Sequence, residues 1–254
     1  MLLAVDIGNT NIVLGVFDGD RLAARFRVAT RQSSTEDEYA LLLSGLLAME
    51  GLSVRDLSGV CMASVVPAVG DVFLRLVSRL VAGPVIVVGP GIKTGISVQY
   101  ESPRDVGADR VVNAVAAFER HRSDLVIVDF GTATTFDAVT AKGEYLGGVI
   151  VPGVTVSLEA LFERTAKLPK VEVARPPAVI GRSTVHSIQS GAYFGYLAMV
   201  EGLVERMKAE LTPPVRVVAT GGLAGLLCAD CKVVDEIDPD LTLRGLKLLW
   251  DKNT

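Results

Sequence analysis

The chain contains nearly the same short motif twice, about half a chain length apart. Residues 3–10 read LAVDIGNT and residues 126–134 read VIVDFGTAT. In both, an apolar run leads into an aspartate, a hydrophobic residue and a glycine, followed by hydroxyl or amide side chains. Asp6 and Asp129 are 123 positions apart in a chain of 254 residues. Internal repeats on this scale predict two copies of one domain that face each other across a cleft.

An Asp-x-Gly turn at the end of a buried strand suits a nucleotide. The glycine lets the backbone approach phosphate oxygens, the turn amides and hydroxyls donate hydrogen bonds, and the carboxylate can hold a cation. In the first turn Asn9, Thr10 and Asn11 supply donors. A single turn of this kind is also compatible with an ordinary hairpin rich in Gly and Asn. The second turn makes nucleotide binding the preferred interpretation.

Composition narrows the class of protein. Half of the residues are apolar and the mean hydropathy is +0.43, yet no apolar run approaches the roughly 18 residues of a membrane helix. The start, MLLAVDIGNT, lacks a basic n-region and reads as a buried first strand, so we expect no signal peptide and a cytoplasmic protein. A net charge of −4 with mixed signs argues against a sequence-independent nucleic-acid surface.

Strand and helix patterns alternate as in an α/β fold. Three strands open the chain, Ser34 can cap the helix that follows, and the three-strand opening recurs in the second half. The expected strands cover residues 2–7, 12–17, 22–29, 59–66, 84–89, 124–130, 133–139, 144–150, 215–220 and 231–234. The expected helices cover about 35–50, 67–81, 107–122, 153–164, 184–210 and 239–251. Residues 166–183 form the one long irregular stretch, expected to run over the surface or into a partner subunit.

Several motifs together carry a resemblance to a known family. They are DIGNT at 6–10, GPGIKTG at 89–95, GADR at 107–110, DFGTATT at 129–135, the stretch from Thr184 through IQSG at 188–191, and the glycine pair at 221–222. With them the chain resembles the actin, sugar-kinase and Hsp70-type ATPases, and over its whole length it is similar to type III pantothenate kinase. The resemblance implies an α/β fold of two duplicated ribonuclease H-like (actin-like ATPase) domains with a nucleotide cleft between them.

The resemblance also implies a division of labour between the halves. Residues 1–118 are expected to carry the first phosphate turn and the pantothenate side, and residues 119–254 the second turn, the adenosine side and dimer contacts. The residues implied in ATP binding are Asp6, Ile7, Gly8, Asn9, Thr10, Asn11, Ile12, Val13, Thr132, Gly221 and Gly222. Thr134 is expected to complete the phosphate clamp with Thr132. The position of Asp129 implies a monovalent cation, K⁺ or NH₄⁺, and Asp6 can hold Mg²⁺ with ATP.

Asp109 is the candidate catalytic base. Phosphoryl transfer to an alcohol needs a carboxylate that accepts the hydroxyl proton. Asp109 opens a helix after two small residues, and the helix N-terminus is expected to favour its ionised form. Arg110 could pair with a substrate carboxylate or a transferring phosphate. Simple helix capping with a surface salt bridge is the alternative for this pair, and the resemblance favours catalysis.

The resemblance further implies contacts with pantothenate. The residues concerned are Tyr100, Gly107, Ala108, Asp109, Arg110 and Thr184. Thr184 would reach the substrate of the neighbouring subunit in a homodimer, although helix capping is an alternative for it. The glycine pair at 221–222 leaves room for an adenine ring to lie against the backbone. An ordinary strand-to-helix turn explains the pair equally well.

Two further motifs are interpreted without a catalytic role. GPGIKTG lacks the glycine spacing and the Gly-Lys-Ser/Thr ending of a P-loop, and reads as a strand-to-loop turn that the resemblance places on the pantothenate side. Cys228 and Cys231 form a C-x2-C without a second pair, and His121 and His186 are the only histidines. Two reduced thiols at a helix end are therefore the favoured interpretation.

The sequence thus predicts an ATP-dependent kinase that phosphorylates the hydroxyl of pantothenate to 4′-phosphopantothenate, the first step of coenzyme A biosynthesis. Residues alone reach only a two-domain ATP-binding fold, and the substrate comes from the resemblance. One alternative is a non-catalytic Bordetella-type transcriptional accessory factor of the same fold. Another is a kinase or ATPase of this superfamily that acts on a different small acid or sugar.

Overall fold

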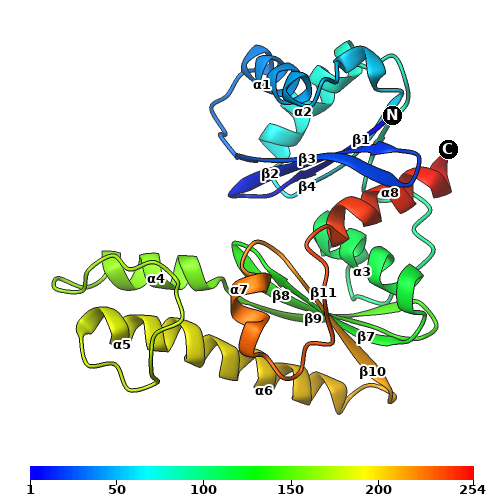
Figure 1. The fold of residues 1–254 in the computed structure, drawn as a ribbon. Helices are drawn as coiled ribbons and strands as arrows, with labels where there is room; N and C mark the ends of the chain where they lie inside the picture. Colours follow the sequence, from blue (N-terminus) through cyan, green and yellow to red (C-terminus); the bar gives the residue numbers. More distant parts are fainter. The chain divides into compact units, whose positions relative to one another are not determined.

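The chain folds into two α/β units, each built around one β-sheet (Figure 1). The computed structural model describes all of residues 1–254. Unit 1 comprises Met1–Gly95, Glu101–Ala116 and Leu241–Thr254, and unit 2 comprises Ile96–Tyr100 and Ala117–Asp240. None of the helices combines the length and the apolar character needed to cross a membrane.

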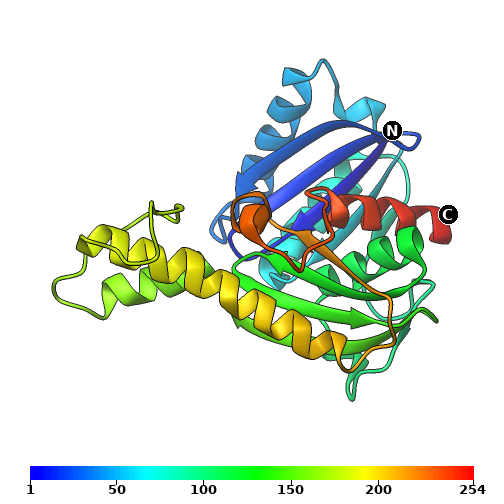
Figure 2. The same ribbon diagram turned by 60° about the horizontal axis from the view of Figure 1, so that its bottom comes forward.

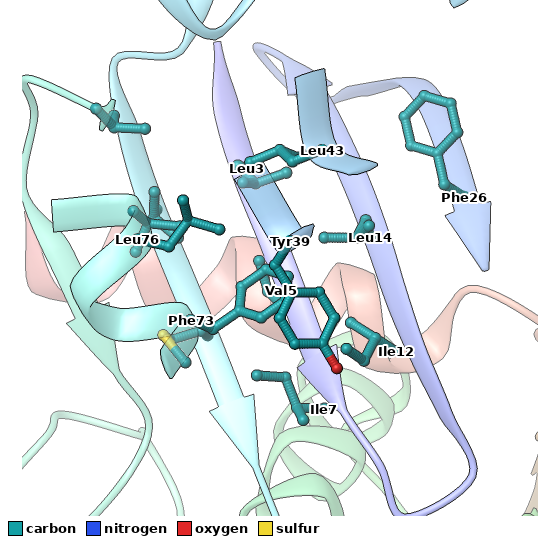
Figure 3. Packing of buried hydrophobic residues seen from close by; sticks show 14 of the residues in the cluster. Leu3, Val5, Ile7, Ile12, Leu14, Phe26, Tyr39, Leu43, Phe73 and Leu76 are labelled. Carbon is teal, nitrogen blue, oxygen red and sulfur yellow. The ribbon is translucent and has the colours of Figure 1, made fainter. Parts of the chain in front are cut away.

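Unit 1 has a five-stranded sheet in the order β3-β2-β1-β4-β5. Its strands are β1 (Leu2–Ile7), β2 (Asn11–Asp18), β3 (Arg21–Ala29), β4 (Gly59–Ser64) and β5 (Val85–Val87). The first three form an antiparallel meander, and β4 and β5 continue from β1 in parallel. Helices α1 (Glu36–Met49) and α2 (Pro67–Leu80) pack on this sheet, and Figure 3 shows their buried side chains meeting those of the strands.

Unit 2 has a six-stranded sheet in the order β11-β10-β7-β8-β9-β6. Its strands are β6 (Ser97–Val98), β7 (Asp124–Phe130), β8 (Ala133–Val139), β9 (Glu144–Pro152), β10 (Val215–Thr220) and β11 (Glu236–Ile237). Its helices are α4 (Val154–Glu163), α5 (Thr184–Ser190), α6 (Tyr196–Lys208) and the short α7 (Ala224–Leu227). A π-helical segment, Gly191–Gly195, joins α5 to α6, so residues 184–208 run as one long helix (Figure 2).

The two sheets repeat one topology. The order β9-β8-β7-β10-β11 has the same sequence of antiparallel and parallel pairs as β3-β2-β1-β4-β5, and β6 is an added edge strand. The register break also recurs, between Val16 and Phe17 in β2 and between Ala138 and Val139 in β8. The second turn is one residue shorter than the first, so Val13, the partner of Asp6, corresponds to Thr135, the partner of Asp129. Each break comes three residues after that position, at Val16 and at Ala138. The predicted duplicated α/β fold is therefore confirmed.

The compact units differ from the predicted halves at their edges. Helix α8 (Leu241–Asn253) packs on β1, β2 and β4 of unit 1, although the sequence assigned it to residues 119–254. Gly59 makes room for it, because a Cβ there would lie 2.0 Å from Cη2 of Trp250. Strand β6 pairs with β9 and therefore belongs to unit 2. The chain passes between the units inside α3 (Ala108–His121), after Ala116.

Two local predictions were wrong. Thr35, not Ser34, caps α1, because its hydroxyl accepts from the Glu38 amide at 3.3 Å while the Glu38 carboxylate accepts from the Thr35 amide at 2.6 Å. Residues 231–234 form no strand, and the edge strand β11 comes after them instead. Its pairing with β10 at Val218 and Ala219 is a long-range contact that a short apolar run does not reveal.

Residues 166–183 contain no helix or strand, as predicted, yet side chains fasten them to their surroundings. Arg175 Nε donates to Asp230 Oδ2 at 2.6 Å, and the Asp230 carboxylate also accepts from the Tyr193 hydroxyl at 3.1 Å. The Ser190 hydroxyl donates to the Val179 carbonyl. This irregular segment joins α4 to α5 at the end of the pair of helices that projects from the sheet of unit 2 (Figure 2).

Candidate active site

The first phosphate turn connects β1 to β2 in unit 1. The Gly8 amide donates to the Asn11 carbonyl at 3.0 Å, and a Cβ on Gly8 would lie 3.1 Å from that oxygen. Asn9 and Thr10 are exposed at the tip, whereas the side chains of Ile7 and Ile12 are buried in the core. Ile7 and Ile12 can therefore reach a nucleotide only through their backbone. The tight, glycine-containing tip fits a phosphate group held by backbone and short polar side chains.

Asp109 lies in the same unit, near the start of α3. Its Oδ1 accepts from the Arg110 amide at 2.8 Å. A Cβ on Gly107 would lie 2.6 Å from that same oxygen and 3.7 Å from Cγ1 of Val65. Val65 comes directly after β4, and its amide donates to the Ile7 carbonyl at 3.0 Å. The structure therefore brings Asp109 to the edge of the sheet at which the first phosphate turn begins.

Burial raises the pKa of the Asp109 carboxyl, and the Arg110 amide and guanidinium offset only part of this effect. The backbone amides at the helix start do favour the ionised form, as the sequence predicted, but desolvation is the larger effect and the pKa is raised overall. A carboxylate with a raised pKa holds a proton more strongly, as a general base requires. The side chain of Arg110 is only 7% exposed, so its charge is held close to Asp109 and away from open solvent.

The second phosphate turn, in unit 2, repeats the hydrogen bonds of the first. The Gly131 amide donates to the Ala133 carbonyl at 3.1 Å, in the place of the bond from Gly8 to Asn11. The Gly153 amide donates to the Thr132 carbonyl at 3.0 Å, as the Thr30 amide does to the Thr10 carbonyl at 2.9 Å. Thr132 is exposed at the tip and can contact a phosphate.

Thr134 does not face the tip. Its side chain is 1% exposed, and its Oγ1 lies 2.6 Å from the Tyr196 hydroxyl. The expectation that Thr134 completes the phosphate clamp was therefore wrong, since its hydroxyl is occupied inside the fold. The alternation of side chains along β8 turns Thr134 toward the core while Thr132 precedes the strand.

Gly221 is packed directly against Asp129. It has φ +96°, and a Cβ there would lie 2.5 Å from Asp129 Oδ1 and 2.6 Å from the Phe130 nitrogen. Only glycine fits this combination of backbone conformation and close approach. The structure thus brings the glycine pair, Gly221 and Gly222, together with Asp129 at the end of β7.

The predicted substrate contacts of unit 2 lie apart from each other. Tyr100 comes shortly after β6 and lies over β9, where a Cβ on Gly147 would come within 3.1 Å of its ring. Thr184 is the first residue of α5 and is exposed. Ser183 caps that helix, accepting from the His186 amide at 3.2 Å, so capping does not explain Thr184.

An apolar groove lies beside Thr184. It has a volume of about 430 Å³ and is lined by α4, α5 and the start of α6, with Leu158, Leu161 and Ile188 among its residues. Leu161 and Phe162 on α4 are 39% and 43% exposed, and Ile180 in the irregular segment is 84% exposed. Exposed apolar surface of this kind is typical of interaction sites.

The GPGIKTG loop and the cysteine pair are the two motifs for which no catalytic role was predicted. In GPGIKTG, the Lys93 amide donates to Asn253 Oδ1 at 2.9 Å and the Lys93 carbonyl accepts from Asn253 Nδ2 at 3.0 Å, which fastens this loop to α8. The cysteines are free thiols. A hydrogen bond from the Cys228 thiol lowers the pKa of Cys231 to about 7.

A family profile matches most of the chain, and full-length relatives match all of it. The family profile of type III pantothenate kinases matches residues 2–206. Relatives with that name from Geotalea uraniireducens, Myxococcus xanthus and Moorella thermoacetica are 50%, 51% and 49% identical to it. Each match covers 100% of this chain and at least 99% of the relative. The chain belongs to the type III pantothenate kinase family.

Solved structures of proteins with much lower sequence identity share the fold of this chain. A proposed Baf family transcriptional activator from Campylobacter jejuni matches with a TM-score of 0.62 at 18% identity, covering 99% of this chain and 98% of that one. A proposed N-acetylglucosamine kinase from Porphyromonas gingivalis matches with a TM-score of 0.53 at 13% identity, covering 100% and 99%. At these identities the likeness concerns the fold alone.

Sequence reasoning missed two residues whose hydrogen bonds lie beside the turns, Thr30 and Tyr196. Thr30 is the residue directly after the third strand, so its place beside the first turn could have been found from the expected strand order. Tyr196 has no such signal, because its position depends on the π-helical segment that precedes it.

Proposed function

We propose that this protein transfers the γ-phosphoryl group of ATP to the hydroxyl of pantothenate, giving 4′-phosphopantothenate in the first step of coenzyme A biosynthesis. Its membership of the type III pantothenate kinase family over the full chain is the observation that carries the proposal. ATP is a cytoplasmic metabolite, so the proposed reaction also agrees with the location expected from the sequence.

Asp109 is proposed to accept the proton of the pantothenate hydroxyl. Its place near the start of α3, beside the first phosphate turn of unit 1, supports this role, and burial gives its carboxyl a raised pKa. Arg110 is proposed to bind the pantothenate carboxylate or the transferring phosphate, with Gly107 and Ala108 leaving room at the helix start. Tyr100 is proposed to contact the same substrate.

Both phosphate turns are proposed to bind ATP. In unit 1 these residues are Asp6, Ile7, Gly8, Asn9, Thr10, Asn11, Ile12 and Val13, and in unit 2 they are Thr132, Gly221 and Gly222. Carboxylate oxygens suit Mg²⁺ at Asp6 and a monovalent cation at Asp129. When bound, these cations neutralise phosphate charge, while the turn amides and hydroxyls orient the nucleotide.

The protein is further proposed to act as a homodimer in which Thr184 reaches the partner's substrate site. The exposed position of Thr184 beside the apolar groove of unit 2 supports this arrangement. A second copy of the chain would cover the groove and the exposed Ile180.

The test is a coupled assay of ATP consumption with pantothenate, with identification of the phosphorylated product. We expect turnover with pantothenate and none with a panel of sugars. A matched control is Asp109→Asn, which keeps the size of the side chain and removes the base. Absence of turnover, with binding to DNA or to a transcription complex instead, would favour the non-catalytic alternative.

A further inference from the structure

The first phosphate turn is braced by a hydroxyl from the end of the third strand. Thr30 Oγ1 donates to the Gly8 carbonyl at 2.6 Å, and the Thr30 amide donates to the Thr10 carbonyl at 2.9 Å. One residue thus holds the turn at two points. Because the turn tip is exposed, such bonds keep its donors in one arrangement before a nucleotide binds.

The second turn lacks this brace. The residue equivalent to Thr30 is Gly153, whose amide still donates to the Thr132 carbonyl but which has no hydroxyl. A Cβ on Gly153 would lie 2.4 Å from the Thr132 carbonyl oxygen and 2.6 Å from that of Gly131. No side chain can therefore occupy this place, so residue 153 cannot brace the turn as Thr30 does.

Tyr196, on the long helix of unit 2, places a hydroxyl near this turn, against residues directly beside it. Its hydroxyl oxygen lies 2.6 Å from Thr134 Oγ1 and 2.8 Å from the Pro152 carbonyl oxygen. Thr134 is on β8 and Pro152 ends β9, and Pro152 pairs in register with Ala133 beside the turn. The tyrosine is 8% exposed, so its bonds are shielded from water.

The π-helical segment explains how one helix can make this contact. Gly191–Gly195 adds an extra residue to the helical repeat immediately before Tyr196, which changes the face that Tyr196 presents relative to α5. Interrupted helices of this kind are frequent at functional sites.

We propose that Tyr196 is a positioning residue for the second phosphate turn. Its hydroxyl ties the ends of β8 and β9 together and so holds the Thr132 loop in the arrangement that binds ATP. The inference rests on the proposed contact between Thr132 and ATP. It differs from that proposal because Tyr196 touches neither nucleotide nor cation.

The experiment compares Tyr196→Phe with Tyr193→Phe in the full-length enzyme. Tyr193 lies three residues earlier on the same helix and is also buried, but its hydroxyl contacts Asp230 and the Leu226 carbonyl. We expect Tyr196→Phe to raise the KM for ATP about two- to tenfold, the effect of one lost hydrogen bond, with an unchanged KM for pantothenate. Tyr193→Phe should leave both constants within twofold of the parent.

Further variants separate the possible outcomes. Thr134→Val removes one of the two contacts of the Tyr196 hydroxyl and leaves the one to the Pro152 carbonyl, so it should raise the KM for ATP by no more than Tyr196→Phe does. The double variant should add nothing to the change seen in Tyr196→Phe. Thr134→Val also replaces Tyr196→Phe if the latter fails to fold. If Thr132→Ala raises the KM for ATP but neither bond-removing variant does, the role of Tyr196 is wrong. If Thr132→Ala itself leaves the KM for ATP unchanged, the proposed contact between Thr132 and ATP is wrong, and the inference that rests on it is overturned as well. Equal changes in both KM values would indicate a purely structural role for Tyr196 and overturn the inference.

Discussion

At the scale of single residues, the chemistry of Asp109 is decided by two opposing effects. The Arg110 amide and guanidinium stabilise the ionised carboxylate, whereas burial destabilises it, and burial is the larger effect. The net result is a carboxyl whose pKa lies above its ordinary value. Such a carboxylate accepts a proton more readily than a solvated aspartate does, which suits the role of a general base.

The pH dependence of catalysis depends on this shift. As the proposed base, Asp109 would act when deprotonated, so kcat/KM for pantothenate should fall as the pH drops through its raised pKa, at a higher pH than for an ordinary aspartate. Asp109→Asn should lower kcat by ~10²–10⁴-fold and leave ATP binding nearly intact. Steady-state rates across pH and ATP titrations check both points. An activity of Asp109→Asn within threefold of the parent would remove Asp109 from the role of base.

At the scale of helices and strands, the sequence predicted nearly every element, because the hydrophobic periodicity of an element and the turn residues at its ends are local features of the sequence. The three-strand openings and most helices lie within a few residues of their predicted bounds. The elements that failed depended on distant partners. The short β11 is defined by its pairing with β10, and α8 belongs to unit 1 because Gly15 and Gly59 leave room for Leu243 and Trp250. The turns of the site were recognisable, while the brace at Tyr196 was not.

The turn after β10 gives a test at this scale. Gly221→Ala would place a Cβ against Asp129 at a positive φ, so we expect the free energy of unfolding to fall by about 1–3 kcal/mol. The added Cβ would also displace the Asp129 carboxylate, so it should weaken the proposed activation by K⁺. Gly225→Ala is the matched control, because it lies in α7 and its Cβ would meet nothing within 4 Å. Thermal unfolding and K⁺ titration of activity measure both effects. Equal stability of the two variants would contradict the packing argument.

At the scale of the whole molecule, the two copies of the fold differ most in the segment after the third strand. In unit 1, β3 leads through a short loop into α1. In unit 2, β9 leads into α4, the irregular segment and the long helix, which together project from the sheet (Figure 2). The helices of this projection line the apolar groove. Duplication alone would give a similar helix in both places. The added length in unit 2 therefore suits a function that unit 1 does not have, and we propose that this function is dimerisation.

The exposed apolar tip of this projection gives a direct test of the dimer. Ile180 is 84% exposed, and a carboxylate there would be buried against the partner in the proposed interface. Ile180→Asp should therefore shift the protein from dimer to monomer in sedimentation experiments. Leu41→Asp is the matched control, because Leu41 is 75% exposed on α1 of unit 1 and should leave the dimer intact. A parent protein that is monomeric at working concentration would rule out the interface.

Composite active sites would allow two impaired chains to form a complete site together. Thr184→Ala should weaken use of pantothenate more than binding of ATP, because Thr184 is proposed to contact only the partner's substrate. In a mixed dimer of Asp109→Asn and Thr184→Ala chains, one site holds an intact Asp109 and receives an intact Thr184 from the partner. Random exchange at equal concentrations makes about half of the dimers mixed, so about one quarter of all sites should be complete. Activity should rise toward that fraction as subunits exchange. Verified exchange without a gain in activity would show that Thr184 acts within its own chain or not at all.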